Sequence, residues 1–98
     1  MIGSFGDRTT HDLYHGIESK AARAIPPAAV GAALRKLDML SAALELRDLW
    51  APPGNRLEKL RGDLEGCHSI RVNDRYRLVF RWSGSDAKNV RFVDYHKG

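Results

Sequence analysis

The chain has 98 residues, of which 43% are hydrophobic and 29% are charged. This length allows one hydrophobic core and no second lobe, so a single globular domain over residues 1–98 is expected. The first ten residues lack the apolar region of a signal peptide, and no stretch approaches the roughly 20 apolar residues of a membrane helix. The one cysteine, Cys67, cannot form an internal disulfide and is expected to be a small buried residue. These features predict a cytoplasmic protein without membrane contacts.

The net charge of +4 is distributed unevenly along the chain. Residues 1–54 contain six Lys or Arg and six Asp or Glu, whereas residues 55–98 contain ten and six. All the excess positive charge therefore lies in the second half. This distribution favours a polyanion such as nucleic acid as the partner, although an acidic protein would be attracted in the same way.

Two helices are predicted in the first half, after a short apolar start at Ile2 and Phe5 that favours a first strand. Residues 7–16 predict a short helix that ends at Gly16, the residue type preferred just after a helix. Residues 25–46 predict a longer amphipathic helix with Pro27 in its first turn. Its apolar face is expected to contain Val30, Ala33, Leu34, Leu37, Leu40, Ser41 and Leu44.

Strands are predicted beyond the helix-breaking run APPGN at residues 51–55, because the hydrophobic period changes there to about two. The candidates are residues 56–60, 68–72, 76–82 and 89–95. Their short connections make consecutive strands antiparallel. The expected fold is therefore α+β, with helices packed on one face of a small antiparallel sheet.

The other face of this sheet is expected to carry arginines, because Arg77 and Arg81 alternate with the apolar Leu78 and Phe80. Two interpretations remain open. The face is either a solvated surface covered by arginine stems or a binding surface. On either interpretation Arg77 lies on an open face, and its replacement by alanine is expected to cost little stability.

Other chemical motifs are weak or absent. His11 and His15 in HDLYH have a spacing that can bind zinc, but no clear third ligand follows, so surface histidines are the preferred interpretation. The glycines are scattered through turns and form no phosphate-binding loop, and no serine or cysteine has the setting of a nucleophile. No metal and no cofactor are therefore expected.

A group of residues suited to RNA cleavage remains near the end of the sequence, where Asp94, Tyr95 and His96 follow a predicted strand. Cleavage without a metal needs a base for the ribose 2′-hydroxyl, an acid for the leaving oxygen and cations for the charge on phosphorus. Histidine can transfer protons near neutral pH, and the planar guanidinium of arginine suits phosphate. Arg61, Arg71 and Arg77 are the candidate cations.

The runs PPGNRLEKLRGD and HSIRVNDRYRLVF, followed by VDYH, resemble the HigB toxins, or plasmid maintenance system killer proteins, of the RelE/ParE superfamily. The resemblance covers nearly the whole chain, from MIGSF onward, and is strongest over residues 45–96. It implies a RelE-like toxin fold and a ribosome-dependent mRNA endoribonuclease that inhibits translation. It also implies neutralisation by a HigA-like helix-turn-helix antitoxin, with operator DNA bound only through the antitoxin complex.

The resemblance implies that Asp94, Tyr95, His96 and Arg77 belong to the active site and that Arg61 is the basic residue before the Gly-Asp turn, and the remaining candidates come from the residue pattern itself. The candidate catalytic residues are His96, Tyr95, Asp94, Arg77 and Glu58. The candidate RNA-binding residues are Arg61, Arg71, Lys59 and Arg91. Glu58 departs from the pattern, because some members have a histidine in this region and a carboxylate would repel phosphate.

Two alternatives remain. A ParE-like toxin would poison DNA gyrase by protein binding and would not cleave RNA. A degenerate toxin would only bind its antitoxin. The run of Asp94, Tyr95 and His96 favours the nuclease, because a gyrase-binding protein does not need this chemistry.

Overall fold

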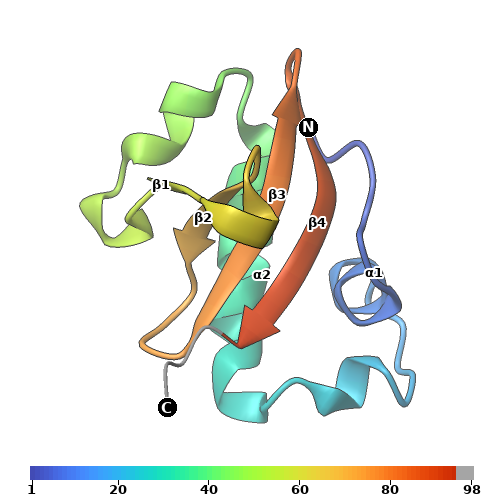
Figure 1. Cartoon of the computed structure of the whole chain (residues 1–98). Helices are drawn as coiled ribbons and strands as arrows, with labels where there is room; N and C mark the ends of the chain where they lie inside the picture. Colours follow the sequence, from blue (N-terminus) through green and yellow to red (C-terminus); the bar gives the residue numbers. More distant parts are fainter. Residues whose placement is uncertain (95–98) are drawn as a thin grey trace.

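The structure is a computed structural model that describes residues 1–94 (Figure 1). Its helices are α1 (Arg8–His15) and α2 (Pro27–Ala42), and its strands are β1 (Glu58–Lys59), β2 (His68–Arg71), β3 (Tyr76–Ser83) and β4 (Asp86–Asp94). Short 3-10 turns lie at Ala22–Ala24, Leu46–Trp50, Pro53–Asn55 and Gly62–Leu64. None of the helices within residues 1–94 is long and apolar enough to span a membrane.

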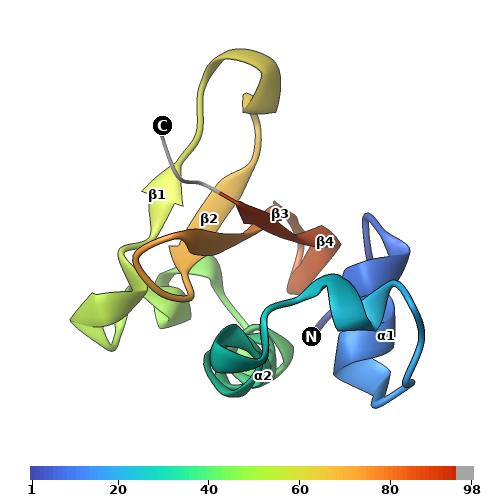
Figure 2. The same ribbon diagram turned by 90° about the horizontal axis from the view of Figure 1, so that it is seen from below.

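The four strands form one antiparallel sheet in the order β1-β2-β3-β4. Helix α2 lies under one face of this sheet, and α1 lies beside β4 (Figure 2). This arrangement confirms the predicted α+β fold.

Helix α1 is defined by residues at both of its ends. The carboxylate of Asp7 accepts a hydrogen bond from the backbone N–H of Thr10 at 2.8 Å, which caps the first turn. Gly16 ends the helix in the left-handed conformation (φ 69°), which is why glycine suits this position. Both helix ends agree with the prediction.

Helix α2 presents small and branched apolar residues to the sheet. Ala29, Ala33, Leu37 and Leu40 are buried and form one cluster with Ile70, Leu78, Phe80 and Val90 of the strands. The helix is shorter than predicted, because Ala43 adopts an extended conformation. The prediction that Leu44 belongs to the apolar face is therefore wrong: its side chain is 71% exposed.

The strands differ from the prediction in length more than in number. Strand β1 has only two residues instead of the predicted five. Strand β4 starts earlier, at Asp86, because Gly84 (φ 64°) permits a tight turn after β3. The strand register shifts between Val79 and Arg81, beside Asn89 with its positive φ of 53°. This bulge allows both Ala87 and Val90 to face the core.

The first residues cover the outer edge of β4 instead of forming a separate strand. Ile2 and Phe5 make isolated parallel bridges to Ala87 and Val90. Farther along this edge, the backbone N–H of Phe92 donates to the hydroxyl of Thr10 in α1 at 2.8 Å. The edge is thus partly closed by the chain itself, which limits pairing with other strands.

The face of the sheet opposite α2 is not an open surface. Leu60, Cys67 and Val79 are buried together, and Leu64 and Val93 pack against them. The segment between β1 and β2 therefore covers part of this face. The burial of Cys67 is confirmed.

We expect Thr10→Val to lower the free energy of unfolding by about 1–3 kcal/mol, because it leaves the Phe92 N–H without its acceptor at a fully buried position. The measurement is urea denaturation. Thr9→Val, the same change at the preceding and less buried residue of α1, is the control and should change stability by less than about 0.5 kcal/mol. Equal losses in the two variants would contradict the role given to the hydroxyl.

Candidate active site

Arg77 is the central polar residue of the sheet face opposite α2. Its residue exposure is 7%, so the expectation of an open position with little effect on stability is wrong. The Nε–H donates to the hydroxyl of Ser69 at 2.8 Å, and Nη2 donates to the carbonyl of Arg56 at 2.5 Å. Two neighbouring segments therefore fix the plane of the guanidinium.

The Arg56 carbonyl is positioned by the loop before β1. Asn55 is fully buried and donates from Nδ2 to the carbonyls of Leu49 and Ala51, both at 3.2 Å. Its Oδ1 accepts from the ammonium group of Lys36 in α2, and burial lowers the pKa of that lysine. Arg56 follows in the left-handed conformation (φ 45°). The PPGN run thus shapes the backbone that contacts Arg77.

Two carboxylates lie beside two arginines on this face. Glu58 Oε1 is 3.5 Å from Nη1 of Arg77. Arg71 of β2 lies directly opposite Arg77 in the strand pairing, and its guanidinium binds Asp74. Like charges opposite each other destabilise a sheet, so these carboxylates offset the repulsion between the two arginines. The structure brings Glu58, Arg71 and Arg77 together.

Asp94 lies on the other face of the sheet. It pairs with Tyr76, whereas the adjacent Val93 pairs with Arg77, and successive residues of a strand point to opposite sides. Its Oδ2 accepts from Arg75 Nε at 3.0 Å and Nη2 at 2.9 Å, and these contacts raise the pKa of Arg75. The structure therefore does not place the Asp94 side chain on the face of Arg77. Tyr95 and His96 lie outside the described residues.

Arg75 is a residue that the sequence analysis did not select. The sequence feature that could have indicated it is its position in the turn before β3, from which its side chain can reach the end of the antiparallel strand β4. Recognising it requires the register that pairs Tyr76 with Asp94.

The remaining candidate RNA-binding residues are spread over the molecule. Lys59 pairs with His68, whose ring packs on Phe80 on the helix side of the sheet. Burial lowers the pKa of His68, and the charge of Lys59 lowers it further. Arg61 is exposed before the turn at Gly62–Leu64.

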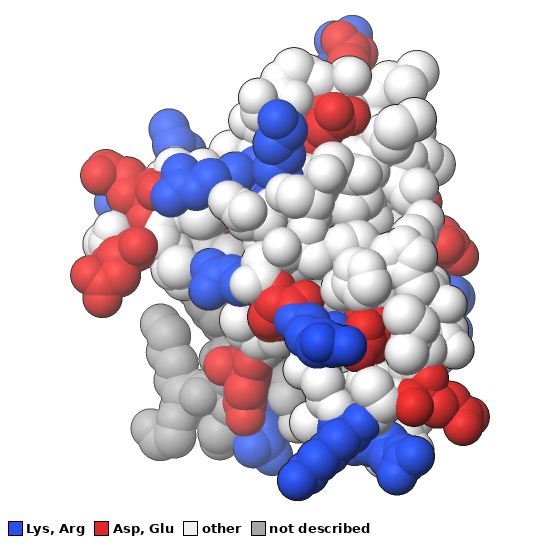
Figure 3. Space-filling view, turned by 90° about the vertical axis from the view of Figure 1, so that its right-hand side faces the viewer, with Lys and Arg blue, Asp and Glu red and all other residues white. Residues whose placement is uncertain are grey.

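Arg91 packs across the N-terminal segment at the edge of the sheet. A side chain at Gly6 would overlap its Cγ, at 2.4 Å. The side of the molecule with α1 and this edge shows mixed charges around a broad uncharged area (Figure 3). The positive charge is thus not continuous on this side.

A groove in the molecule lies away from this face. Among residues 1–94, no three or more His, Cys, Asp or Glu side chains form a group that could hold a metal ion. The groove, of about 700 Å³, lies between α1, the following loop and α2, and Leu13, Ile17 and Val30 contribute to its lining. It is on the helix side of the sheet, away from Arg77.

Comparison with known proteins gives consistent results. A family model described as the RelE-like toxin of type II toxin-antitoxin system HigB matches residues 4–96. Toxin HigB-1 of Vibrio cholerae is 44% identical over 97 residues, which cover 99% of both chains. An uncharacterized Haemophilus influenzae protein is 42% identical over 62 residues, covering 63% of this chain and 60% of that protein.

Among solved structures, the YoeB-YefM complex from Staphylococcus aureus contains a chain with a TM-score of 0.60 and 18% identity, covering 99% of both chains. This likeness extends to the whole fold of helices packed on a four-stranded antiparallel sheet, and the matching family model makes the chain a toxin of the RelE-like class. Within this class, the chain belongs to the HigB-like family, the toxins of type II toxin-antitoxin systems.

We expect Ser69→Ala to destabilise the protein by about 1.5–3 kcal/mol, because the buried Nε–H of Arg77 loses its acceptor and hydrogen bonds to charged groups are strong. Urea denaturation measures the loss. Ser83→Ala at the exposed end of β3 is the matched control and should change stability by less than about 0.5 kcal/mol. If the two variants were equally stable, Ser69 would not fix the guanidinium.

Proposed function

We propose that this toxin is a ribosome-dependent endoribonuclease that cleaves mRNA and thereby inhibits translation. Membership of the HigB-like family supports the proposal. The observation that carries it is the buried, oriented guanidinium of Arg77, held by Ser69 and Arg56. A cation fixed before the substrate arrives stabilises developing charge without reorganisation, which is the main requirement of phosphoryl transfer.

In the proposed reaction the ribose 2′-oxygen attacks the adjacent phosphorus and loses its proton to a base. The bond from phosphorus to the 5′-oxygen breaks, and that oxygen takes a proton from an acid. The products are a 2′,3′-cyclic phosphate and a 5′-hydroxyl. Atoms and charge balance without a metal ion, so no metal is assigned to the step.

His96 is proposed as the main proton-transfer group and Tyr95 as a hydrogen-bond donor to the phosphate or the leaving oxygen. Arg77 stabilises the charge on the phosphorane. Asp94 is proposed to hold the end of β4 in place through Arg75 rather than to transfer a proton, because its carboxylate already accepts two hydrogen bonds from that guanidinium. Glu58, beside Arg77, remains the second candidate base.

Binding of the RNA backbone is assigned to Arg61, Arg71, Lys59 and Arg91. These residues lie on different elements, so each is proposed to contact a different phosphate rather than one shared phosphate. Such contacts depend on salt, whereas loss of Arg77 affects the reaction itself. The contact with Asp74 leaves Arg71 less available than the exposed Arg61.

The proposed partner is a HigA-like helix-turn-helix antitoxin, with operator DNA bound only through that complex. The family description as a toxin of a type II toxin-antitoxin system supports this proposal. The similar solved chain comes from a YoeB-YefM complex. Growth arrest by the toxin and rescue by co-expression of the antitoxin would follow.

We expect His96→Gln to reduce mRNA cleavage by about 10²- to 10⁴-fold, because glutamine retains hydrogen bonding but cannot transfer the proton. Primer extension on an mRNA that is being translated measures the cleavage. A chelator is added to show that the reaction needs no metal, and only after the ribosomes have been assembled in magnesium. Lys88→Gln, at an exposed position of β4, is the control and should cleave normally.

Cleavage by His96→Gln at the rate of the unaltered toxin, with normal folding and antitoxin binding, would contradict the proposed chemistry. A DNA supercoiling assay with gyrase would then test the ParE-like alternative. Absence of cleavage and of gyrase inhibition by the unaltered toxin, with intact antitoxin binding, would instead support the degenerate toxin.

We expect Glu58→Gln to change cleavage by less than about tenfold, because a carboxylate 3.5 Å from a guanidinium is better suited to balance its charge than to accept a proton. The same primer extension assay measures this effect. A loss of 10² or more, with stability retained, would identify Glu58 as a base of the reaction. Glu65→Gln, the same change at an exposed position between β1 and β2, is the matched control and should cleave normally.

A further inference from the structure

Two histidines of α1 form a feature that the proposed nuclease does not use. His11 and His15 are both exposed and lie one helical turn apart. Their ring centroids are separated by 4.3 Å, with an angle of 34° between the planes. Spacing alone is weak support for a metal site. The hydrogen bonds of each ring show which nitrogen atom is available to a metal ion.

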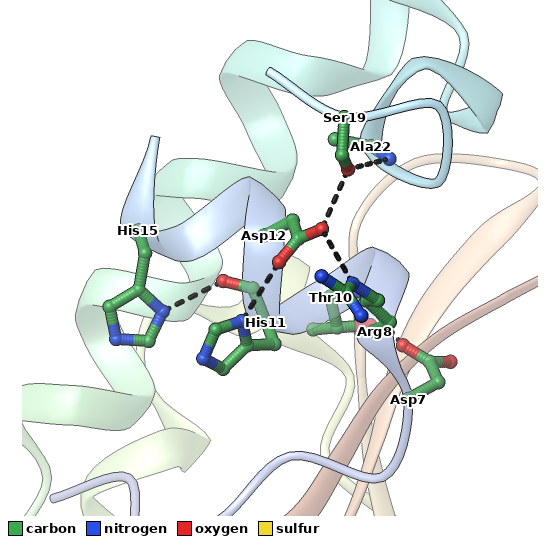
Figure 4. A network of polar contacts seen from close by, with 8 residues as sticks. All are labelled: Asp7, Arg8, Thr10, His11, Asp12, His15, Ser19 and Ala22. Carbon is green, nitrogen blue, oxygen red and sulfur yellow. Dashed lines mark hydrogen bonds and ion pairs between the residues drawn. The ribbon is translucent and has the colours of Figure 1, made fainter. Parts of the chain in front are cut away.

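Each ring uses its Nδ1 atom within the protein. His11 Nδ1 is 2.9 Å from Oδ1 of Asp12, and His15 Nδ1 is 2.8 Å from the backbone carbonyl oxygen of His11. A carboxylate and a carbonyl can only accept hydrogen bonds, so both Nδ1 atoms carry the proton. In the neutral rings, the lone pair is therefore on Nε2. Figure 4 shows that both Nε2 atoms point away from the network of dashed contacts.

Neighbouring rings restrict the two imidazoles. The ring of Phe5 contacts both edge-on, at centroid distances of 5.5 Å from His11 and 5.6 Å from His15. Tyr14 contacts His15 at 5.4 Å from another direction. The rings are thus held beside each other before any ligand binds, which reduces the entropy lost on chelation.

The carboxylate behind His11 is itself fixed. Asp12 is 1% exposed, and its Oδ2 accepts from the hydroxyl of Ser19 at 2.6 Å and lies 3.5 Å from Nε of Arg8 (Figure 4). The ring of His11 and the hydroxyl of Ser19 thus bind the two different carboxylate oxygens of Asp12. Metal-binding histidines usually donate their second N–H to a carboxylate or a backbone carbonyl, and this pair has one of each.

We propose that His11 and His15 bind a divalent transition-metal ion that prefers imidazole, such as Zn²⁺, through their two Nε2 atoms. No third protein ligand joins them among residues 1–94, so water completes the coordination. The ion is exchangeable, and it clamps the last turn of α1. The site is separate from the nuclease proposal, because α1 lies beside β4 and not on the face of Arg77.

The test is calorimetric titration of ZnCl₂ into chelator-treated protein without an affinity tag. We expect one ion per chain. His11→Gln and His15→Gln should each lower the affinity for Zn²⁺ by about tenfold or more, because loss of a residue that only orients a metal ligand already lowers affinity by about 10- to 100-fold. His96→Gln is the control, because it removes another histidine of the sequence, and its affinity should be unchanged. The melting temperature should rise with ZnCl₂ in the unaltered protein and much less in His15→Gln.

Retained affinity in His15→Gln, or its loss in His96→Gln, would overturn the proposal, as would no detectable heat and no shift in melting temperature with the unaltered protein. His15 is the more decisive position. Among residues 1–94, its exposed ring contacts the carbonyl of His11 and the rings of Phe5, His11 and Tyr14, so its variant should fold. Asp12→Asn adds a second readout. It keeps both metal ligands and should weaken Zn²⁺ binding by about 10- to 100-fold if the carboxylate orients His11.

Discussion

The outer edge of β4 is the constraint on which much of the arrangement depends. A nine-residue strand at the border of a sheet exposes backbone groups that need partners. Here the first residues pair with its start, and the Thr10 hydroxyl accepts from Phe92 farther along. This last bond sets α1 against the edge, so that Leu13 faces the core and the two histidines face solvent. The position of α1 therefore depends on the hydrogen bonds that the backbone of β4 requires as well as on hydrophobic burial.

The two faces of the sheet serve different purposes. The face toward α2 is a continuous apolar core, whereas the opposite face combines a small apolar cluster with Arg77. A buried guanidinium is tolerated only if its donors have acceptors, and Ser69 and Arg56 provide them. The same contacts that make burial possible also fix the direction of the charge. Stability and the proposed chemistry thus both depend on Arg77, and its replacement by alanine would reduce both.

The sequence was sufficient where local patterns determine structure. Alternation defined β3, and Gly16 with the helical spacing defined the limits of α1. Other features depend on contacts between distant segments. The burial of Arg77 requires residues 56–67 to fold over the sheet, and alternation indicates only which face a residue occupies. Likewise, Asp94 can bind the Arg75 side chain only because of the strand register. The bulge beside Asn89 has no reliable signal in an alternating sequence pattern. The candidate site was therefore predicted as a set of residues but not as a geometry.

The charges around Arg77 bear on why the proposed nuclease would act on the ribosome. Glu58 is already close to the guanidinium, and Asp74 binds Arg71 opposite it. A phosphate that approaches this face must compete with both carboxylates, so free RNA gains less from these cations than it would from unpaired ones. Binding energy from another surface would be needed to hold the backbone against Arg77. In the proposed function the ribosome supplies it by presenting the mRNA in a fixed position. Charge compensation within the folded toxin would then limit cleavage of RNA outside the ribosome.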